Sequence, residues 1–458
     1  MALCRKKGIL YFLHRICKNR KNQVQYKCCQ TILMERFVIN GGKPLKGEIE
    51  VRGAKNAAFP ILAATILTKE DCVIENLPLV EDVYRMIELL ESMGTQVEWR
   101  GERVVSIHTR NLNPATINKR LVLRFRGAVL LFGPLLARFG VVNLPQPGGC
   151  MIGARPIDTH LDAFAQLGVK ITPRKDGFKL VAPAHIQSQE VILNEFSVTA
   201  TENILLYASA CPEKIVLKIA DQDYQVQELV KFLKKMGSRI TIPQSHEFLI
   251  QGQQELTGAS HQLMADPIEA GTFIAMAVGA KGDVLVKNVE YRFLELFLKK
   301  LRDFGAQLEI IPNKRGSADV HVSPTRALKI DKIQSLIYPG IHSDLQSVLG
   351  VLATQSRGST LLHDPLYEGR LRYLEELNKM GAEIYFTDPH RAIINGPAKL
   401  YGTDLGTFDL RGGAALIMAA LIAKGRSAIN NIYQVDRGYE HIEERLQALG
   451  ADIQRISD

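Results

Sequence analysis

The sequence lacks an uninterrupted apolar segment long enough to cross a membrane. Its longest apolar runs, 127–137 and 412–423, extend over about a dozen residues, whereas a membrane-spanning helix needs roughly 20. Apolar residues make up 46% and charged residues 23% of the 458 residues, a balance typical of soluble globular proteins. We therefore expect no membrane insertion and no chain-wide disorder.

Excess charge is also scarce outside the first 35 residues. The net charge of the chain is +9, but residues 1–35 carry eight Lys or Arg and one acid, so this leader holds +7 and the remaining residues hold +2. A nearly neutral body argues against nucleic-acid binding. The leader has little apolar periodicity, and we interpret it as an upstream-start extension with Met34 as a second candidate start; a targeting tail or a surface-binding arm is the alternative.

Cysteine is equally scarce outside the leader. Four of the seven cysteines precede residue 30, and only Cys72, Cys150 and Cys211 follow. The number is odd and no CxxC pair occurs, which favours a reducing compartment without structural disulfides or a zinc site. The sequence also lacks a Walker loop, a GxGxxG fingerprint and an HExxH motif, so we expect neither a metal nor a nucleotide cofactor.

What the sequence does contain is a sixfold internal repeat. Six segments share a helix end of the form apolar-x-x-apolar-Gly followed by a short strand, with glycines roughly 70 residues apart: Gly94, Gly168, Gly237, Gly305, Gly381 and Gly450. Each glycine stands where a helix must reverse through a left-handed backbone conformation. Upstream of each lies a stretch of small and aliphatic residues typical of a buried helix: 55–67, 126–140, 201–210, 269–282, 343–358 and 411–425. Six such units predict α/β or α+β layers, most simply two domains of three units each.

Cations stand at the starts of three of these predicted buried helices. Lys55, Arg126 and Arg411 occupy positions where the helix dipole disfavours positive charge. Acids and Ser at the other helix starts are explained by ordinary N-capping. A cation there makes sense when an anion binds to it and to the backbone N–H groups together, so these residues predict an anionic ligand.

One loop carries a candidate reactive thiol. Residues 144–160 are rich in proline and glycine, which makes a regular helix or strand implausible around Cys150. Arg155 follows five residues later, and a cation near a cysteine lowers the pKa of the thiol. A small buried cysteine is the alternative for Cys150, and it is the interpretation we favour for Cys72 and Cys211.

Five segments, "GAKNAAFPILAA", "PGGCMIGARPID", "SVTATEN", "YPGIHSDLQ" and "DRGYEHIEERLQALGA", resemble the UDP-N-acetylglucosamine enolpyruvyl transferase family, also called the UDP-N-acetylglucosamine 1-carboxyvinyltransferases. The resemblance runs in order from Arg36 to the C-terminus. It implies an inside-out α/β barrel of two domains with six βαβαββ units. Residues 36–54 plus 265–458 would form one domain, and residues 55–264 would form the second, which bears the Cys150 loop.

The resemblance also implies the reaction, which is the first committed step of peptidoglycan synthesis. The enolpyruvyl group of phosphoenolpyruvate would be transferred to the 3′-hydroxyl of UDP-N-acetylglucosamine by addition and elimination, with release of phosphate and without a cofactor. Such an enzyme would be cytoplasmic and would bind these two small molecules. The sequence does not indicate the oligomeric state.

By motif match, Cys150 would be the general acid and Asp344 the base near the sugar hydroxyl. Lys55, Arg155, Arg370 and Arg437 would hold the phosphate and carboxylate groups of the substrate. The positions that match UDP-sugar ligands are Asn56, Arg126, Arg155, Pro156, Ile157, Asp158, Thr159, Ser197, Val198 and Leu366. Two positions depart from the family pattern: Thr199 stands where the family usually has Gly in a turn that faces the diphosphate, and Glu195 stands where a basic residue is common.

Three alternatives remain open from the sequence. The first is a transferase like 5-enolpyruvylshikimate-3-phosphate synthase, against which the Cys150 loop argues. The second is a non-catalytic paralogue that binds UDP-sugar and regulates cell-wall synthesis. The presence of Cys150, Lys55 and Asp344 argues against this alternative. The third is an RNA-processing enzyme of the related cyclase architecture, against which the nearly neutral body argues.

Overall fold

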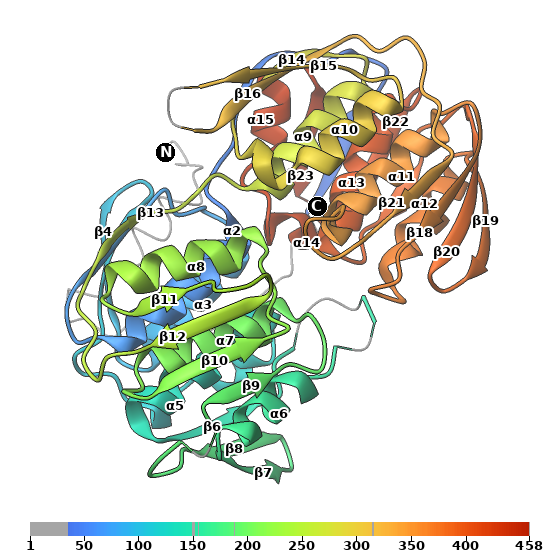
Figure 1. Ribbon diagram of the computed structural model, residues 1–458. Helices are drawn as coiled ribbons and strands as arrows, with labels where there is room; N and C mark the ends of the chain where they lie inside the picture. The colour runs from blue at the N-terminus through green and yellow to red at the C-terminus, as the bar shows by residue number, and fades with distance from the viewer. Residues whose placement is uncertain (1–34, 149–151, 154, 187, 314–315, 458) are drawn as a thin grey trace, which may run out of the picture. The chain divides into compact units, whose positions relative to one another are not determined.

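The computed structural model describes residues 35–148, 152–153, 155–186, 188–313 and 316–457. Residues 1–34 of the leader and Cys150 therefore lie outside the described residues, and our interpretations of them stay predictions. Glu35, which we had counted in the leader, is the first residue of strand β1 (Glu35–Asn40) and pairs with Ser457. Within the described part, no helix is both long enough and apolar enough to span a bilayer. The described chain is a mixed α/β structure with six sheets, shown in Figure 1.

Three sheets take all their strands from residues 72–262. The first has the order β13 (Ser260–Gln262), β3 (Cys72–Glu75), β5 (Val104–His108) and β4 (Gln96–Gly101). The second has the order β6 (Val141–Pro145), β8 (Gly177–Val181) and β7 (Lys170–Arg174). The third has the order β11 (Arg239–Thr241), β12 (Glu247–Gln251), β10 (Lys214–Lys218) and β9 (Glu190–Ile192).

The other three sheets combine residues 35–50 with residues 283–457. The first has the order β15 (Gln307–Pro312), β16 (Ala318–Ser323), β14 (Asp283–Val289) and β2 (Lys46–Glu50). The second has the order β17 (Lys332–Gln334), β18 (Gly358–His363), β20 (Arg391–Gly396) and β19 (Glu383–Asp388). The third has the order β21 (Asp404–Gly406), β22 (Arg426–Asn430), β1 (Glu35–Asn40) and β23 (Asp452–Ser457).

The five four-stranded sheets share one pairing pattern. Each has one parallel pair at an edge and two antiparallel pairs, as in β13–β3, β3–β5 and β5–β4. The parallel pairs of the other four are β9–β10, β2–β14, β17–β18 and β21–β22. No sheet in the described residues mixes strands from 72–262 with strands from the rest of the chain.

The six buried stretches predicted from the sequence are confirmed as helical. They are α2 (Lys55–Ala64), η3 (Arg126–Leu131) with α5 (Phe132–Phe139), α7 (Val198–Ser209), α9 (Pro267–Gly279), α11 (Ser343–Thr354) and α13 (Leu410–Ile422). The second of them begins as a 3-10 helix and continues as the α-helix α5, rather than forming one α-helix as expected. The helices α9, α11 and α13 pack against one another (Figure 1).

The left-handed turns predicted at the six repeat glycines are also confirmed. Each follows an amphipathic helix: α3 (Glu81–Ser92), α6 (Asp158–Gln166), α8 (Tyr224–Lys235), α10 (Glu295–Asp303), α12 (Tyr373–Lys379) or α15 (Ile442–Ala448). All six glycines have a positive φ, for example +94° at Gly94 and +87° at Gly450. At Gly94 a Cβ atom would also lie only 2.9 Å from the carbonyl oxygen of Asn111, so no side chain fits there.

Short elements complete the described chain. They are η1 (Thr65–Leu67), η2 (Pro114–Thr116), α4 (Lys119–Val122), η4 (Tyr291–Phe293), η5 (Arg370–Arg372) and α14 (Tyr433–Asp436). Two of them place predicted site residues, because Arg370 opens η5 and Arg437 directly follows α14.

Candidate functional site

Asp344, the predicted base, lies in the first turn of α11 between two arginines. Its Oδ1 accepts a hydrogen bond from Arg370 Nη2 at 2.8 Å, and its Oδ2 accepts one from Arg411 Nε at 2.9 Å. Burial alone would raise the pKa of Asp344, but the charges of Arg411 and Arg370 outweigh it and hold this pKa far below its usual range. The carboxyl group is therefore ionised at neutral pH and can accept a proton.

Lys55 and Arg437 share a second carboxylate, that of Asp82. Lys55 is the first residue of α2, and its Nζ lies 3.2 Å from Asp82 Oδ2. Arg437 Nε donates to Asp82 Oδ1 at 2.9 Å. All three side chains are buried, and Lys55 is close enough to Asp344 to contribute to its lowered pKa. The two carboxylates and their four cations thus form one buried ionic cluster.

A third group of cations has no carboxylate partner among the described residues. Arg126 opens η3, and its Nη2 donates to the carbonyl oxygen of Pro156 at 2.8 Å. Burial and then the neighbouring charge of Arg155 lower the pKa of Arg126 to about 10. Arg155 lies over the ring of Tyr367 at 5.7 Å, and Arg370 lies over the same ring at 5.2 Å. Tyr367 therefore connects this pair of arginines to the ionic cluster around Asp344.

The start of α7 lies near Arg126. Ser197 is the N-cap of α7, with its hydroxyl accepting from the backbone N–H of Ala200 at 3.4 Å, and Val198 is the first helical residue. The Thr159 hydroxyl donates to Glu195 Oε1 at 2.9 Å, so a carboxylate stands beside this helix start. Thr199 accepts from or donates to His160 Nε2 at 3.0 Å.

The remaining predicted ligands are placed on the same elements. Asn56, the second residue of α2, donates to the hydroxyl of Tyr224 at 3.1 Å. Ile157 is buried, whereas Pro156 and Asp158 are exposed at the start of α6. Leu366 is an exposed apolar side chain next to Tyr367. The structure thus brings the predicted site residues that it describes close to the three cation groups or to the helix starts beside them.

The loop that bears Cys150 is described at its flanking residues. Ile152 is buried, and its carbonyl oxygen accepts from the N–H of Gly369 at 3.0 Å. A Cβ on Gly153 would lie 2.7 Å from the carboxylate of Glu368, so the chain there passes close to residues 368–370. The two other body cysteines are buried, and burial raises the pKa of Cys72 to about 11 and of Cys211 to about 12.

Sequence reasoning missed Asp82, His160 and Tyr367. Asp82 stands in the first turn of α3, where an acid is explained by the helix dipole alone, so nothing in the sequence marked it as the partner of Lys55. Arg411 was noticed as a cation at a helix start, but its partner is the carboxylate of Asp344. For Lys55 and Arg411 a side-chain carboxylate therefore supplies the negative charge that we had assigned to an anionic ligand.

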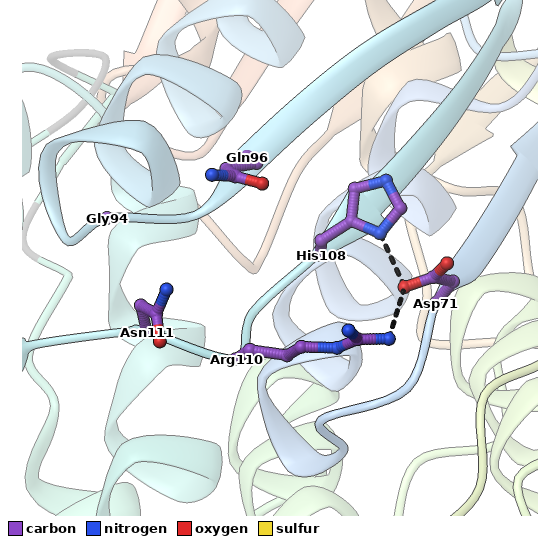
Figure 2. A pocket seen from close by; sticks show the side chains of 6 residues that line it. All are labelled: Asp71, Gly94, Gln96, His108, Arg110 and Asn111. Carbon is purple, nitrogen blue, oxygen red and sulfur yellow. Dashed lines mark hydrogen bonds and ion pairs between the residues drawn. The ribbon is translucent and has the colours of Figure 1, made fainter.

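A polar pocket of 360 Å³ is drawn in Figure 2. Asp71, Gln96, His108, Arg110 and Asn111 line it together with Gly94. Figure 2 shows Asp71 between His108 and Arg110. Asp71 Oδ1 lies 2.5 Å from His108 Nδ1 and 3.8 Å from Arg110 Nη2. The charges of the residues that line the pocket are thus largely satisfied by one another, and none of the predicted site residues lines this pocket. Within the described ranges, no group of three or more His, Cys, Asp or Glu side chains is arranged to hold a metal ion.

Known proteins resemble this chain over most of its length. The family model of EPSP synthase (3-phosphoshikimate 1-carboxyvinyltransferase) matches residues 39–446. The UDP-N-acetylglucosamine 1-carboxyvinyltransferase of Treponema denticola is 37% identical over 428 residues, covering 92% of this chain and 99% of the relative. The enzyme of the same name from Bradyrhizobium diazoefficiens is 38% identical over 433 residues, covering 92% and 98%.

Solved structures share the fold. The enolpyruvyl transferase NikO from Streptomyces tendae superposes with a TM-score of 0.83 at 24% identity, covering 93% of this chain and 100% of that chain. EPSP synthase from Acinetobacter baumannii superposes with a TM-score of 0.72 at 18% identity, covering 92% and 100%. The identity and coverage of the curated relatives, together with the family model, show that this chain belongs to the UDP-N-acetylglucosamine 1-carboxyvinyltransferases within the EPSP synthase family of enolpyruvyl transferases.

Proposed function

We propose that this protein transfers the enolpyruvyl group of phosphoenolpyruvate to the 3′-hydroxyl of UDP-N-acetylglucosamine and releases phosphate, the first committed step of peptidoglycan synthesis in the cytoplasm. The observation that carries the proposal is the ionised Asp344 carboxylate held between Arg370 and Arg411, beside the buried Lys55 and Arg437. A base among buried cations suits an acid–base reaction on a substrate that bears phosphate and carboxylate groups.

The proposed chemistry has two steps. In the addition, Cys150 gives a proton to the methylene carbon of phosphoenolpyruvate, the sugar oxygen bonds to its C2, and Asp344 takes the hydroxyl proton. In the elimination, the Cys150 thiolate takes a proton back from the methyl carbon, the double bond forms again, and the C–O bond to phosphate breaks as the proton held by Asp344 passes to the leaving phosphate. Cys150 and Asp344 therefore return to their starting protonation states, and no redox partner is needed.

Asp344 is a weak base as long as both arginines hold it. Their guanidinium groups lower its pKa, and Arg370 is itself one of the proposed phosphate or carboxylate ligands. When the phosphate group of the substrate draws Arg370 away, the hold on Asp344 weakens and its basicity rises. Substrate binding would thereby activate the base.

The nucleotide sugar would bind at the starts of α2, η3, α6 and α7. Arg126 and Arg155 have no carboxylate partner among the described residues and lie near the N-terminus of α7, which suits a diphosphate. Asn56, Pro156, Ile157, Asp158, Thr159, Ser197, Val198 and Leu366 would line the rest of the site. Lys55, Arg155, Arg370 and Arg437 would hold phosphoenolpyruvate.

We further propose the finer architecture expected from the resemblance. Two domains, 55–264 and 36–54 plus 265–458, would each contain three βαβαββ units in an inside-out barrel. The separation of strands between two sets of sheets, and the recurring pattern of one parallel and two antiparallel pairs, support this division. Residues 1–34 would be an extension, because Glu35 already belongs to β1, and a chain starting at Met34 should turn over like the full chain.

A phosphate-release assay tests the function. The full chain is incubated with UDP-N-acetylglucosamine and phosphoenolpyruvate, and with shikimate 3-phosphate in place of the nucleotide sugar. We expect phosphate only with the nucleotide sugar, and a loss of about 10²–10⁴-fold in turnover for Cys150→Ser, because a hydroxyl is a far weaker acid than a thiol. Binding of UDP-N-acetylglucosamine without phosphate release would point to the regulatory paralogue instead.

Thiol labelling tests the role of Cys150 independently of turnover. Fosfomycin, an epoxide that resembles phosphoenolpyruvate, should alkylate Cys150 alone when UDP-N-acetylglucosamine is present. Cys72 and Cys211 are the internal controls, because both are buried and their raised pKa values keep them as unreactive thiols. Peptide mapping by mass spectrometry reports the site, and labelling spread over several cysteines would contradict the assignment.

A further inference from the structure

A chain of four hydrogen bonds runs from the interior to the start of α7, and its direction is fixed at the buried end. The backbone N–H of Gly133 donates to Asn203 Oδ1 at 2.8 Å. Because this bond identifies the amide oxygen, the other amide atom is Nδ2, which donates to the Val129 carbonyl oxygen and to His160 Nδ1, both at 3.0 Å. His160 Nδ1 is therefore an acceptor.

The tautomer of His160 follows from that bond. An imidazole whose Nδ1 accepts carries its proton on Nε2, so Nε2–H donates to Thr199 Oγ1 at 3.0 Å. Burial, with a smaller contribution from Arg126, lowers the pKa of His160 to about 3. The ring therefore stays neutral and keeps this tautomer at physiological pH.

Thr199 is left with an unused donor. Its Oγ1 accepts from His160, so its own hydroxyl hydrogen is free to point elsewhere, and the structure gives it no acceptor among the described residues. Thr199 is the second residue of α7 and is partly exposed. The backbone N–H groups of Val198 and Thr199 likewise have no acceptor in the described part of the chain, as expected for the first turn of a helix. The first turn of α7 thus carries three donors without an acceptor among the described residues, next to a partly exposed side chain.

The charges around this point favour an anion. Arg126 lies close enough to His160 to affect its pKa, and Arg126 and Arg155 lack carboxylate partners in the described ranges. The carboxylate of Glu195 is one opposing charge, and Thr159 donates a hydrogen bond to it. Two cations, two backbone donors and one hydroxyl therefore stand against the carboxylates of Glu195 and of Asp158, which is exposed at the start of α6.

We propose that the Thr199 hydroxyl is a specificity-determining donor to a diphosphate oxygen of the nucleotide sugar, with Asn203 and His160 as positioning residues that keep its hydrogen turned toward the ligand. This proposal rests on the proposed function, because that function supplies the diphosphate. A hydrogen bond to a charged group contributes about 1.5–3 kcal/mol, which corresponds to roughly 10–100-fold in affinity.

Calorimetric binding of UDP and of uridine separates this role from a structural one. Thr199→Val keeps the branched shape but removes the donor, and Thr199→Ser keeps the hydroxyl. We expect Thr199→Val to bind UDP roughly 10–100-fold more weakly and uridine as tightly as the unsubstituted chain does, and Thr199→Ser to restore UDP binding to within about threefold. In turnover, the change should appear mainly in KM for UDP-N-acetylglucosamine.

Two outcomes would overturn the proposal. One is equal UDP affinity of Thr199→Val and the unsubstituted chain. The other is an equal loss of affinity for UDP and uridine, which would show that the substitution disturbs α7 as a whole. Melting temperatures of all variants are measured alongside, because Thr199→Val leaves the Nε2–H of His160 without its acceptor. Since UDP binding needs no turnover, absence of phosphate release would refute the proposed function and leave this result interpretable.

Discussion

The cations of the candidate site fall into two groups that differ in how their charge is balanced. Lys55, Arg370, Arg411 and Arg437 are buried and paired with the carboxylates of Asp82 and Asp344. Arg126 and Arg155 contact a carbonyl oxygen and an aromatic ring, and the described residues supply no carboxylate to either. The charges of the first group are balanced by protein carboxylates before any substrate binds, whereas those of the second group are not balanced by any carboxylate of the described residues.

This difference predicts different roles in folding and in binding. A buried ion pair is strongly destabilised when one partner is removed, because the other charge stays buried without compensation. An unpaired cation has no such partner, so its removal affects binding far more than stability. The two groups can therefore be separated by measuring turnover, unfolding and affinity on matched variants.

The largest effect should come from Asp344→Asn, which keeps the shape of the side chain but removes the base. We expect turnover to fall by about 10²–10⁴-fold. The control is Asp409→Asn, because Asp409 also lies near Arg370, at 3.6 Å, and caps α13, where Asn is an equally good cap. Similar losses in both variants would mean that Asp344 only balances charge.

Asp82→Asn should have the next largest effect, on stability. It removes the carboxylate that the buried Lys55 and Arg437 share, for which we expect about 3–5 kcal/mol of destabilisation in urea unfolding. Inorganic phosphate should raise the melting temperature of this variant more than that of the unsubstituted chain, because an anion then replaces part of the negative charge that Asp82 supplied to Lys55 and Arg437. An equal phosphate effect in both proteins would argue against a phosphate site at these two residues.

Arg126→Met tests the unpaired group. We expect the affinity for UDP-N-acetylglucosamine to fall roughly 10–100-fold, because a charge-assisted hydrogen bond is lost, while the melting temperature changes little. Arg110→Met is the matched control: Arg110 is an exposed arginine in the polar pocket of Figure 2. A large loss of stability in Arg126→Met would show that its charge is balanced within the protein after all.

The smallest effect concerns acid stability. The pKa of Asp344 in the folded state is lowered below its unfolded value of about 3.9. The contribution of this carboxylate to the free energy of unfolding is therefore complete when the pH is above the unfolded pKa, and it is lost as the pH falls toward and through the folded pKa. Unfolding free energies in urea between pH 5 and pH 3 should therefore fall less steeply in Asp344→Asn, by at most about 1.4 kcal/mol per pH unit. Arg126→Met should keep the slope of the unsubstituted chain, and a changed slope there would contradict the comparison.

Much of the fold was predictable because local chemistry dictates it. The six glycines stand where the backbone needs a left-handed conformation with positive φ, which glycine adopts without steric cost. The stretches of small and aliphatic residues predict helices that are buried on all sides. The second buried stretch was only partly predicted, because periodicity does not distinguish the 3-10 geometry of η3 from an α-helix.

Site residues were predictable from the sequence where their charge opposes the local helix dipole, and they were not predictable where the residue type is ordinary for its position in a helix. Lys55, Arg126 and Arg411 oppose the helix dipole and were noticed for that reason. Asp82 agrees with the dipole of α3, and His160 lies within an amphipathic helix, so both agree with their surroundings and gave no signal. Their partners come from segments 27 to 355 residues away, and such pairing is fixed only by the tertiary fold.

The position of strand β1 (Glu35–Asn40) has a consequence for the synthesis of the protein. β1 lies between β22 (Arg426–Asn430) and β23 (Asp452–Ser457), so the first described strand pairs only with strands from the end of the chain. During translation both edges of β1 remain unpaired until nearly the whole polypeptide has left the ribosome. Unpaired strand edges are sites of aggregation. We therefore expect β1 to need protection by a chaperone until β22 and β23 have been synthesised and can pair with it. A chain stopped before residue 426 cannot complete this sheet, however well its other sheets form.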